Sequence, residues 1–257
     1  MMTLKYDRLL LVSFLGALGM VSPARSQDIT HTVEINGVAG YLEVRTSRGA
    51  ALGVRITPGR KLSATSDLDD GTLTINGRIG SNARSACTVV GPPNARVEQT
   101  TINGTVYTPE DLPRIVVTGP DSLALNINGS VFRGTSGSIG AASIQQNGCS
   151  LLTLGNIAGD LELNVTGSGK TSIGAVGGKT DINIEGSGDV DVASVSDQVE
   201  INIRGAGNVY LMRGRSQLEV NINGSGSVRH GLPNSKCART RFRHLRIALD
   251  TGHGHIS

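Results

Sequence analysis

A glycine recurs at a constant interval through the second half of the chain. Six glycines follow one another with a 19-residue period: Gly129, Gly148, Gly167, Gly186, Gly205 and Gly224. The clearest copies around them read VTGSGKTSI, IEGSGDVDV, IRGAGNVYL and INGSGSVRH. A fixed period without insertions is typical of a solenoid, in which each repeat contacts only its neighbours. The interval therefore predicts a stack of regular coils over residues 123–228.

Apolar and polar residues alternate before each glycine. In one copy Val199, Ile201 and Ile203 alternate with polar residues, which is the pattern of a half-buried strand. Apolar residues return after the turn, and a third apolar position follows nine residues after the glycine. One repeat is too short for a strand with a crossover helix, which together need roughly 30 residues. We therefore predict an all-β fold, a parallel β-helix or β-solenoid whose 19-residue coils contain two or three short strands.

An amide residue stands three positions before each of these glycines. The row consists of Asn126, Gln145, Asn164, Asn183, Asn202 and Asn221. Its parity places it on the outer face, where amides one coil apart would form a hydrogen-bonded ladder. Such a ladder either fixes the register of the coils or offers a polar strip to a ligand such as a glycan. The six residues are therefore a candidate ligand face.

The N-terminus has the features of an export signal. Lys5 and Arg8 precede an apolar run over residues 9–20, and small residues follow as far as Ser26. This arrangement predicts a signal peptide over residues 1–26, cleaved near Ser26. The run is shorter than the roughly 20 residues that span a bilayer. We expect a protein that is exported to the periplasm, the cell surface or the medium and does not span the membrane.

The charge of the chain argues against a nucleic-acid partner. The formal net charge is +3. Removing residues 1–26 takes away Lys5, Arg8, Arg25 and Asp7, which leaves +1. A charge so close to zero produces no overall field for nucleic acid or lipid.

The three cysteines of the chain are Cys87, Cys149 and Cys237. In an oxidising compartment we expect one disulfide between two of them and one remaining thiol. Their spacing matches no zinc motif, and Cys149 occupies a turn of the repeat. A staple from Cys149 to a flanking segment would fit that position.

The segments on either side of the repeats differ from them. Short strands are expected at residues 32–35, 41–46, 52–56 and 73–75, with a hairpin across Asn103–Gly104. This irregular, β-rich part should begin or cap the solenoid. Residues 233–257 form a basic cap or tail with the candidate basic patch Lys236, Arg239, Arg241, Arg243 and Arg246. Phe242, Leu245 and Leu249 have helical spacing there. The tail either covers the last coil or binds an anionic surface.

The repeated pattern resembles a known family of exported bacterial proteins. Turns of the form [LIV]-N-[IV]-x-G-[SA]-G occur at 163–169, 182–188, 201–207 and 220–226. Together with VEINGVAGYLEVRTSRG (33–49), DDGTLTI (69–75) and PRIVVTGPDSLALNINGS (113–130), they resemble the putative auto-transporter adhesin, head GIN domain family. The resemblance covers about residues 30–232, and we expect a GIN-type β-solenoid domain over residues 28–232. It implies a β-helical exported protein and supplies no catalytic residues.

No motif for catalysis, a cofactor or a metal stands out. GSGDVDV (186–192) lacks the nine-residue period of calcium-binding β-helix repeats, because the aspartate at Asp189 does not recur. Asp181, Glu200 and Glu219 recur once per coil, as acids of a polysaccharide-cleaving β-helix would. Charged residues on an outer strand face more commonly serve solvation. We therefore interpret the chain as a non-catalytic interaction module for a cell-envelope glycan or protein. The alternatives are a carbohydrate-active β-helix enzyme and a structural envelope component that binds a protein.

Overall fold

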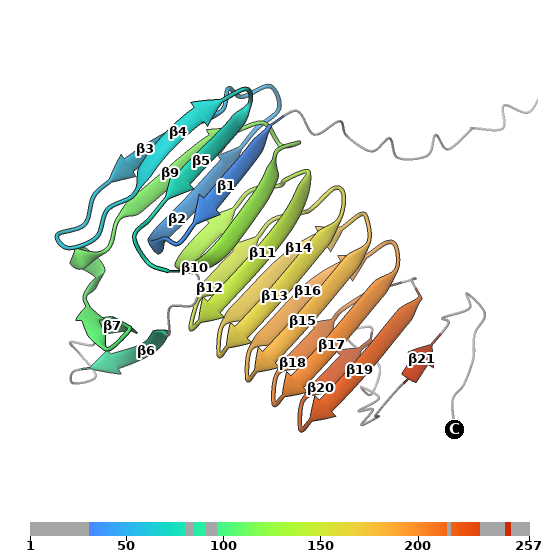
Figure 1. Cartoon of the computed structure of the whole chain (residues 1–257). Helices are drawn as coiled ribbons and strands as arrows, with labels where there is room; N and C mark the ends of the chain where they lie inside the picture. Colours follow the sequence, from blue (N-terminus) through green and yellow to red (C-terminus); the bar gives the residue numbers. More distant parts are fainter. Residues whose placement is uncertain (1–30, 81–84, 91–96, 215–216, 232–244, 248–257) are drawn as a thin grey trace, which may run out of the picture.

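The computed structural model describes residues 31–80, 85–90, 97–214, 217–231 and 245–247. The expected signal peptide, Cys237 and four residues of the basic patch (Lys236, Arg239, Arg241 and Arg243) lie outside these ranges. The described chain is almost entirely β, and its helical element is the three-residue 3-10 helix η1 (Pro109–Asp111). The predicted parallel β-solenoid is confirmed (Figure 1). In the described ranges, no helix is long and apolar enough to cross a membrane.

Two long sheets form the walls of the solenoid. Sheet A contains, from its N-terminal edge, β4 (Thr65–Asp69), β5 (Thr72–Asn76), β1 (Thr32–Asn36), the first half of β10 (Ala124–Ser136), β11 (Ala141–Gly148), β13 (Leu161–Gly167), β15 (Thr180–Gly186), β17 (Val199–Gly205), β19 (Leu218–Gly224) and β21 (Leu245–Ile247). Sheet B contains β3 (Gly53–Thr57), β9 (Arg114–Gly119), β2 (Ala39–Thr46), the second half of β10, β12 (Leu151–Leu154), β14 (Lys170–Val176), β16 (Asp189–Val195), β18 (Asn208–Leu211) and β20 (Ser227–His230).

The inward residues of both sheets fill one narrow core. Ile182 and Ile201 of sheet A and Val190 and Val192 of sheet B have no exposed surface. The third apolar position of each coil also faces inward. It forms a separate row of parallel bridges, Ile139 to Ile157 to Val176, in which neighbouring coils meet again. The coils that contain Ile157, Val176 and Val195 therefore each contribute three apolar segments to the core.

A stack of glycines turns the chain from sheet A to sheet B. Gly205 has a φ of 125°, and a β-carbon at this position would lie 2.3 Å from the carbonyl oxygen of Gly186 in the coil before it. Both the conformation and the close approach require glycine. The spacing of the glycines therefore records the length of one coil.

The N-terminal part extends the same solenoid. β1 pairs with both β5 and β10, and β2 pairs with both β9 and β10, so the first strands of the chain lie in the interior of each sheet. The antiparallel strands β3 and β4 close this end. The strands expected from the sequence are confirmed here, whereas β4 and β6 (Ser85–Val90) were not predicted. Covering the terminal coil protects the sheet edge from further pairing.

The first coil does not share the register of the others. Asn126 pairs with Ser143 rather than with Gln145, so the coil from β10 to β11 is shorter than those that follow, and the ladder shifts between Ile127 and Ser130. From β11 onward the strand pairing keeps the 19-residue period. The prediction that all six copies keep one register is therefore wrong for the first copy. The shorter offset is already present where Ala124 pairs with Ala141, ahead of the irregularity at Asn128 and Gly129.

The C-terminal end of sheet A is covered by β21, which runs antiparallel to β19. Leu245 belongs to a set of apolar residues with helical spacing, but the described segment Leu245–Ile247 is a strand. The open edge of β19 offers backbone hydrogen bonds to an extended segment, which outweighs the weak local preference. The last coil is thus capped as expected.

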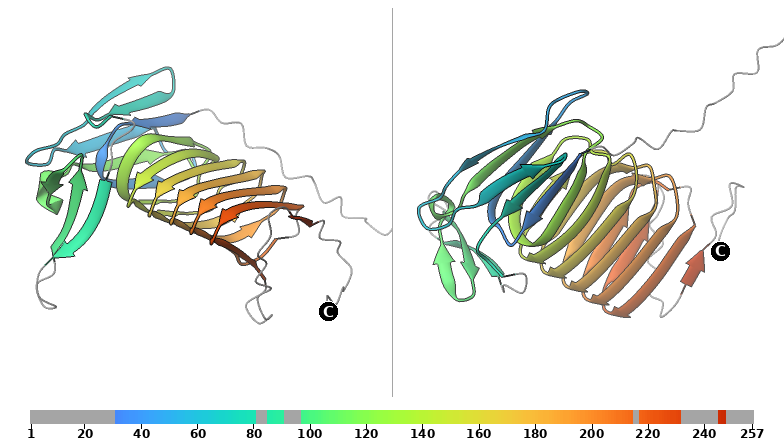
Figure 2. Two further views of the ribbon diagram at one scale, coloured as in Figure 1. Left: turned by 60° about the horizontal axis from the view of Figure 1, so that its bottom comes forward. Right: turned by 45° about the horizontal axis from the view of Figure 1, so that its top comes forward.

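A small antiparallel sheet projects from the solenoid between β5 and β9 in the sequence. This arm consists of β6, β7 (Val97–Ile102) and β8 (Thr105–Tyr107). A disulfide joins Cys87 of β6 to Cys149 in the turn between β11 and β12. Figure 2 shows the arm beside the N-terminal coils, away from the regular stack. The disulfide therefore holds the arm against the start of the repeats.

Candidate functional site

The amide residues form a hydrogen-bonded row along the outer face of sheet A. The Nδ2 atom of Asn183 donates to Oδ1 of Asn164 over 3.1 Å. Asn202 donates to Asn183 over 3.0 Å, and Asn221 donates to Asn202 over 2.9 Å. Exposed Gln145 lies beside Asn164 in the register. The structure therefore brings five of the six predicted residues into one row.

Asn126 is the residue that falls outside this row, because the shifted first coil places it opposite Ser143. Its place toward the N-terminal end is taken by three residues that the 19-residue period did not reveal. Asn128 donates to Asn36 over 2.9 Å, and Asn36 donates to Asn76 over 3.3 Å. Each of the three stands in an Ile-Asn-Gly sequence, but the same tripeptide also occurs at Asn103 and Asn223 outside the row.

A column of acids runs beside the row of amides. Glu162 accepts a hydrogen bond from Asn164 over 3.1 Å, and Asp181 accepts one from Asn183 over 3.0 Å. The same contact joins Glu200 to Asn202 over 3.1 Å. Each amide nitrogen of Asn183 and Asn202 thus uses its two protons on an amide one coil earlier and on an acid of its own strand.

The acids are close enough to affect one another. Burial, with a further contribution from the negative charge of Glu200, raises the pKa of Asp181 above its ordinary value of 3.8, and the hydrogen bond from Asn183 opposes this shift. Glu200 lies one coil from Asp181 in the register. Both stand on the same outer face of sheet A on adjacent strands, so they lie side by side rather than on opposite sides of a bound substrate.

The described residues contain no group of three or more His, Cys, Asp or Glu side chains that could hold a metal ion. The remaining outward column of sheet A is mixed in character. It includes exposed Thr166 and the pair Arg204 and Glu185, whose charged atoms lie 3.4 Å apart. The face is thus polar along its whole length and carries both donors and acceptors.

One residue of the predicted basic patch lies within the described chain. Arg246 of β21 stands opposite Glu219 in the antiparallel pairing with β19. The backbone of the tail therefore reaches the end of the acid column. Of the three cysteines, the structure pairs Cys87 with Cys149.

Comparison with known proteins identifies the family. Residues 33–231 match the family model described as putative auto-transporter adhesin, head GIN domain. The chain belongs to this family. Membership in the GIN-domain family indicates an exported or cell-surface protein with an adhesin-like character. No curated protein matches the sequence.

Solved structures with similar chains include several described as adhesins. A putative adhesin from Parabacteroides distasonis is 14% identical, covers 79% of this chain and 93% of its own, and has a TM-score of 0.38. A putative lipid binding protein from the same species is 16% identical, with coverages of 79% and 94% and a TM-score of 0.29. A putative cell adhesion protein from Clostridium sporogenes is 9% identical, with coverages of 79% and 93% and a TM-score of 0.30. These similarities are too distant to carry an argument about function.

Proposed function

We propose that this GIN-domain protein is a non-catalytic interaction module that binds a cell-envelope glycan or protein with the outer face of sheet A. Export, with cleavage near Ser26, delivers the solenoid to the periplasm, the cell surface or the medium. Family membership supports the adhesin-like character. The amide row supports the choice of face.

The hydrogen-bonded amide row is the observation that carries this proposal. The Asn183 and Asn202 side chains are held at fixed spacing by three contacts of 2.9 to 3.1 Å. Neighbouring strands lie about 4.8 Å apart, so the row offers polar groups at regular intervals along a rigid surface. A preorganised surface loses little conformational entropy on binding, which favours affinity for an extended ligand.

The same contacts argue against the enzyme alternative. Glycosidases need two carboxyl groups that lie on either side of the scissile bond. Asp181 and Glu200 stand one coil apart on one flat face, and each accepts a hydrogen bond from an amide two residues later. The raised pKa of Asp181 is the one feature that favours acid chemistry. It arises from burial and crowding within the acid column.

The test compares two exposed threonines on opposite walls. Thr166 lies on the outer face of sheet A and Thr153 on that of sheet B. The full chain and its Thr166→Tyr and Thr153→Tyr variants are applied to a glycan array and to envelope fractions. We expect Thr166→Tyr alone to abolish binding, because the added ring covers the amide row. Equal binding by both variants would contradict the choice of face.

Catalysis is checked in the same experiment. Every glycan that binds is incubated with the chain, and the reducing ends are counted. New reducing ends that disappear in a variant carrying Asp181→Asn and Glu200→Gln would establish the enzyme alternative and refute a purely binding role.

A further inference from the structure

A second surface lies on the opposite wall, where the arm meets sheet B. Its centre is a row of outward residues from three neighbouring strands. Tyr41 of β2 stands between Arg114 of β9 and Arg133 of β10 in the parallel register. The guanidinium group of Arg114 lies 4.7 Å from the centre of the Tyr41 ring. Two cations therefore flank one aromatic ring.

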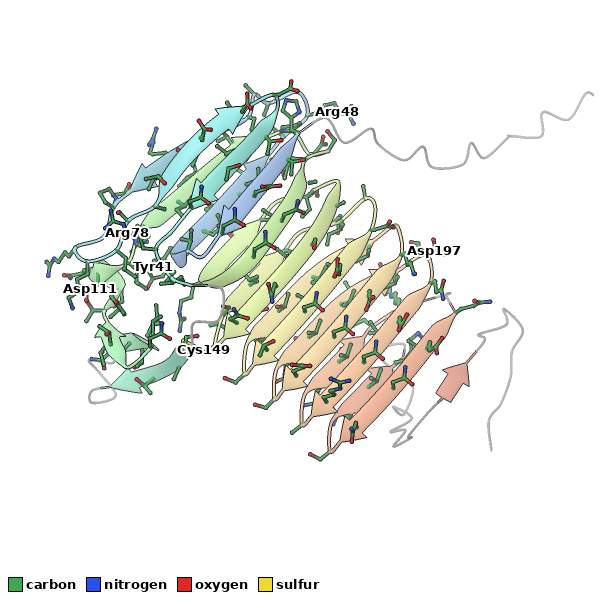
Figure 3. All side chains as sticks on the ribbon, in the orientation of Figure 1. Tyr41, Arg48, Arg78, Asp111, Cys149 and Asp197 are labelled. Atoms are coloured by element: carbon green, nitrogen blue, oxygen red, sulfur yellow. A yellow bond between two sulfur atoms is a disulfide. The ribbon has the colours of Figure 1, made fainter. Side chains whose placement is uncertain are left out.

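The arm turns this row into a recess. The disulfide Cys87–Cys149 and Thr100 of β7 face Tyr41, Arg133 and Leu112 across a shallow hollow. The hollow contains about 260 Å³ of empty space, including open solvent. Figure 3 places Tyr41 and Cys149 on the side of the solenoid that adjoins the arm. Because this figure includes open solvent, the hollow offers a place for a charged group at the surface rather than an enclosed pocket.

Three carboxylates near the recess pair with cations other than Arg114. Glu43 pairs with Arg45 at 2.7 Å, and Asp111 pairs with Lys61 at 2.9 Å. Glu110 pairs with Arg60 at 2.7 Å. Among the residues that the structure describes, no carboxylate forms an ion pair with Arg114. Arg114 therefore brings its positive charge to the recess.

The row continues beyond the recess along the solenoid. Arg133 is followed by Leu151, which is 39% exposed, and then by Lys170. Lys170 contacts Asp191 at 3.3 Å, which weakens its positive charge. Arg114, Arg133 and Lys170 thus stand on every second strand of sheet B, about 9.6 Å apart. This spacing suits an extended polymer that carries acid groups at regular intervals.

We propose that the arm recess binds an acidic polysaccharide through the row Arg114, Tyr41 and Arg133. The planar guanidinium groups would hold a carboxylate or sulfate in paired hydrogen bonds. The ring of Tyr41 supplies an apolar surface of the kind on which sugar rings pack. The disulfide fixes the distance between the two sides of the recess. This site is separate from the outer face of sheet A.

The test measures binding of the full chain to polygalacturonate, dextran sulfate and neutral dextran at low and at physiological salt. We expect binding to at least one of the charged polymers and none to neutral dextran. Polygalacturonate and dextran sulfate distinguish a carboxylate from a sulfate. A double variant, Arg114→Gln with Arg133→Gln, should lose at least about tenfold in affinity, the effect of losing one charge-assisted contact.

Matched controls separate this site from general electrostatic attraction. Arg204→Gln on sheet A and Arg229→Gln at the far end of sheet B remove exposed arginines elsewhere. Each should change the affinity by less than about twofold, a small effect on the same scale. Losses as large as that of the double variant, or equal competition by duplex DNA or anionic vesicles, would overturn the proposal.

Two further variants protect the test against misfolding. Arg114→Lys keeps the charge but loses the planar contact, so it should give an intermediate loss of affinity. Replacing Cys87 and Cys149 with serine should weaken binding while both arginines remain, and undiminished binding would rule out the recess. Thr166→Tyr should leave this binding intact, so failure here and failure of the sheet A proposal give different results.

Discussion

Replacing Thr180 with valine should stabilise the protein. Thr180 lies in the inward row of sheet A between Leu161 and Val199, and it has no exposed surface. Its hydroxyl oxygen is buried and has no hydrogen-bond partner among the residues that the structure describes. An unsatisfied buried polar group costs about 1–3 kcal/mol, and valine has nearly the same shape as threonine. We therefore expect a gain of about 1–2 kcal/mol in the free energy of unfolding.

The same substitution at Thr171 should have the opposite effect. Thr171 is equally buried, but its hydroxyl donates a hydrogen bond to Oε1 of Gln146, which is itself 1% exposed. Nε2 of Gln146 donates to the carbonyl of Ser150 over 2.6 Å. Valine at position 171 would leave the amide oxygen without this donor inside the core. We expect a loss of about 1–3 kcal/mol.

Urea denaturation followed by far-ultraviolet circular dichroism measures both changes. The midpoints of Thr180→Val and Thr171→Val should move in opposite directions while the slopes stay equal. Thermal midpoints should shift by about 2–4 °C for each kcal/mol in a domain of this size. A destabilised Thr180→Val variant would refute the reasoning, since a buried hydroxyl without a partner could not then be costly.

Three further predictions address the turn, the acid column and the arm. Gly205→Ala should destabilise the solenoid by roughly 3 kcal/mol or more, because the backbone strain adds to the clash with Gly186, and the urea midpoint should fall accordingly. The raised pKa of Asp181 means that the folded protein loses stability as the pH rises through and above 3.8, because the unfolded chain ionises first. Asp181→Asn should therefore be more stable than the parent at neutral pH, with no advantage below 3.8, in denaturation series at several pH values. Replacing Cys87 and Cys149 with serine removes a cross-link between residues 62 positions apart, worth about 4 kcal/mol in the chain-entropy description, and limited proteolysis should then cut the arm first.

The sequence was sufficient to predict the regular part of the fold. From β11 to β20, paired residues of neighbouring coils stand 19 residues apart. The glycine spacing gives the length of each of these coils, and the alternation of apolar and polar residues gives its strands. The register of the first coil was not predicted, because the shorter offset between β10 and β11 does not appear in the spacing of the glycines. The spacing from Gly129 to Gly148 matches the repeat by coincidence. In the structure, the strand pairing instead places Asn126 opposite Ser143.

The arm recess could not be predicted from the sequence, because its residues come together through long-range pairing. Tyr41 and Arg114 are adjacent because β9 returns to pair with β2 after the excursion through the arm. Arg133 reaches the other side of Tyr41 through β10. No local pattern encodes this order of strands. The choice of Cys149 as the partner of Cys87 likewise depends on where the arm lies.

The amide row explains how similar coils find one register and also limits how its function is tested. Sliding one strand by a single residue would turn every inward apolar residue to the surface. A slip by two residues would keep that pattern but place Asn202 against Asp181 or Glu185 instead of Asn183, which breaks an amide-to-amide contact. Substituting the row would therefore disturb folding as well as any ligand. A bulky residue at exposed Thr166 leaves the row intact, so a loss of binding there reports on the surface itself.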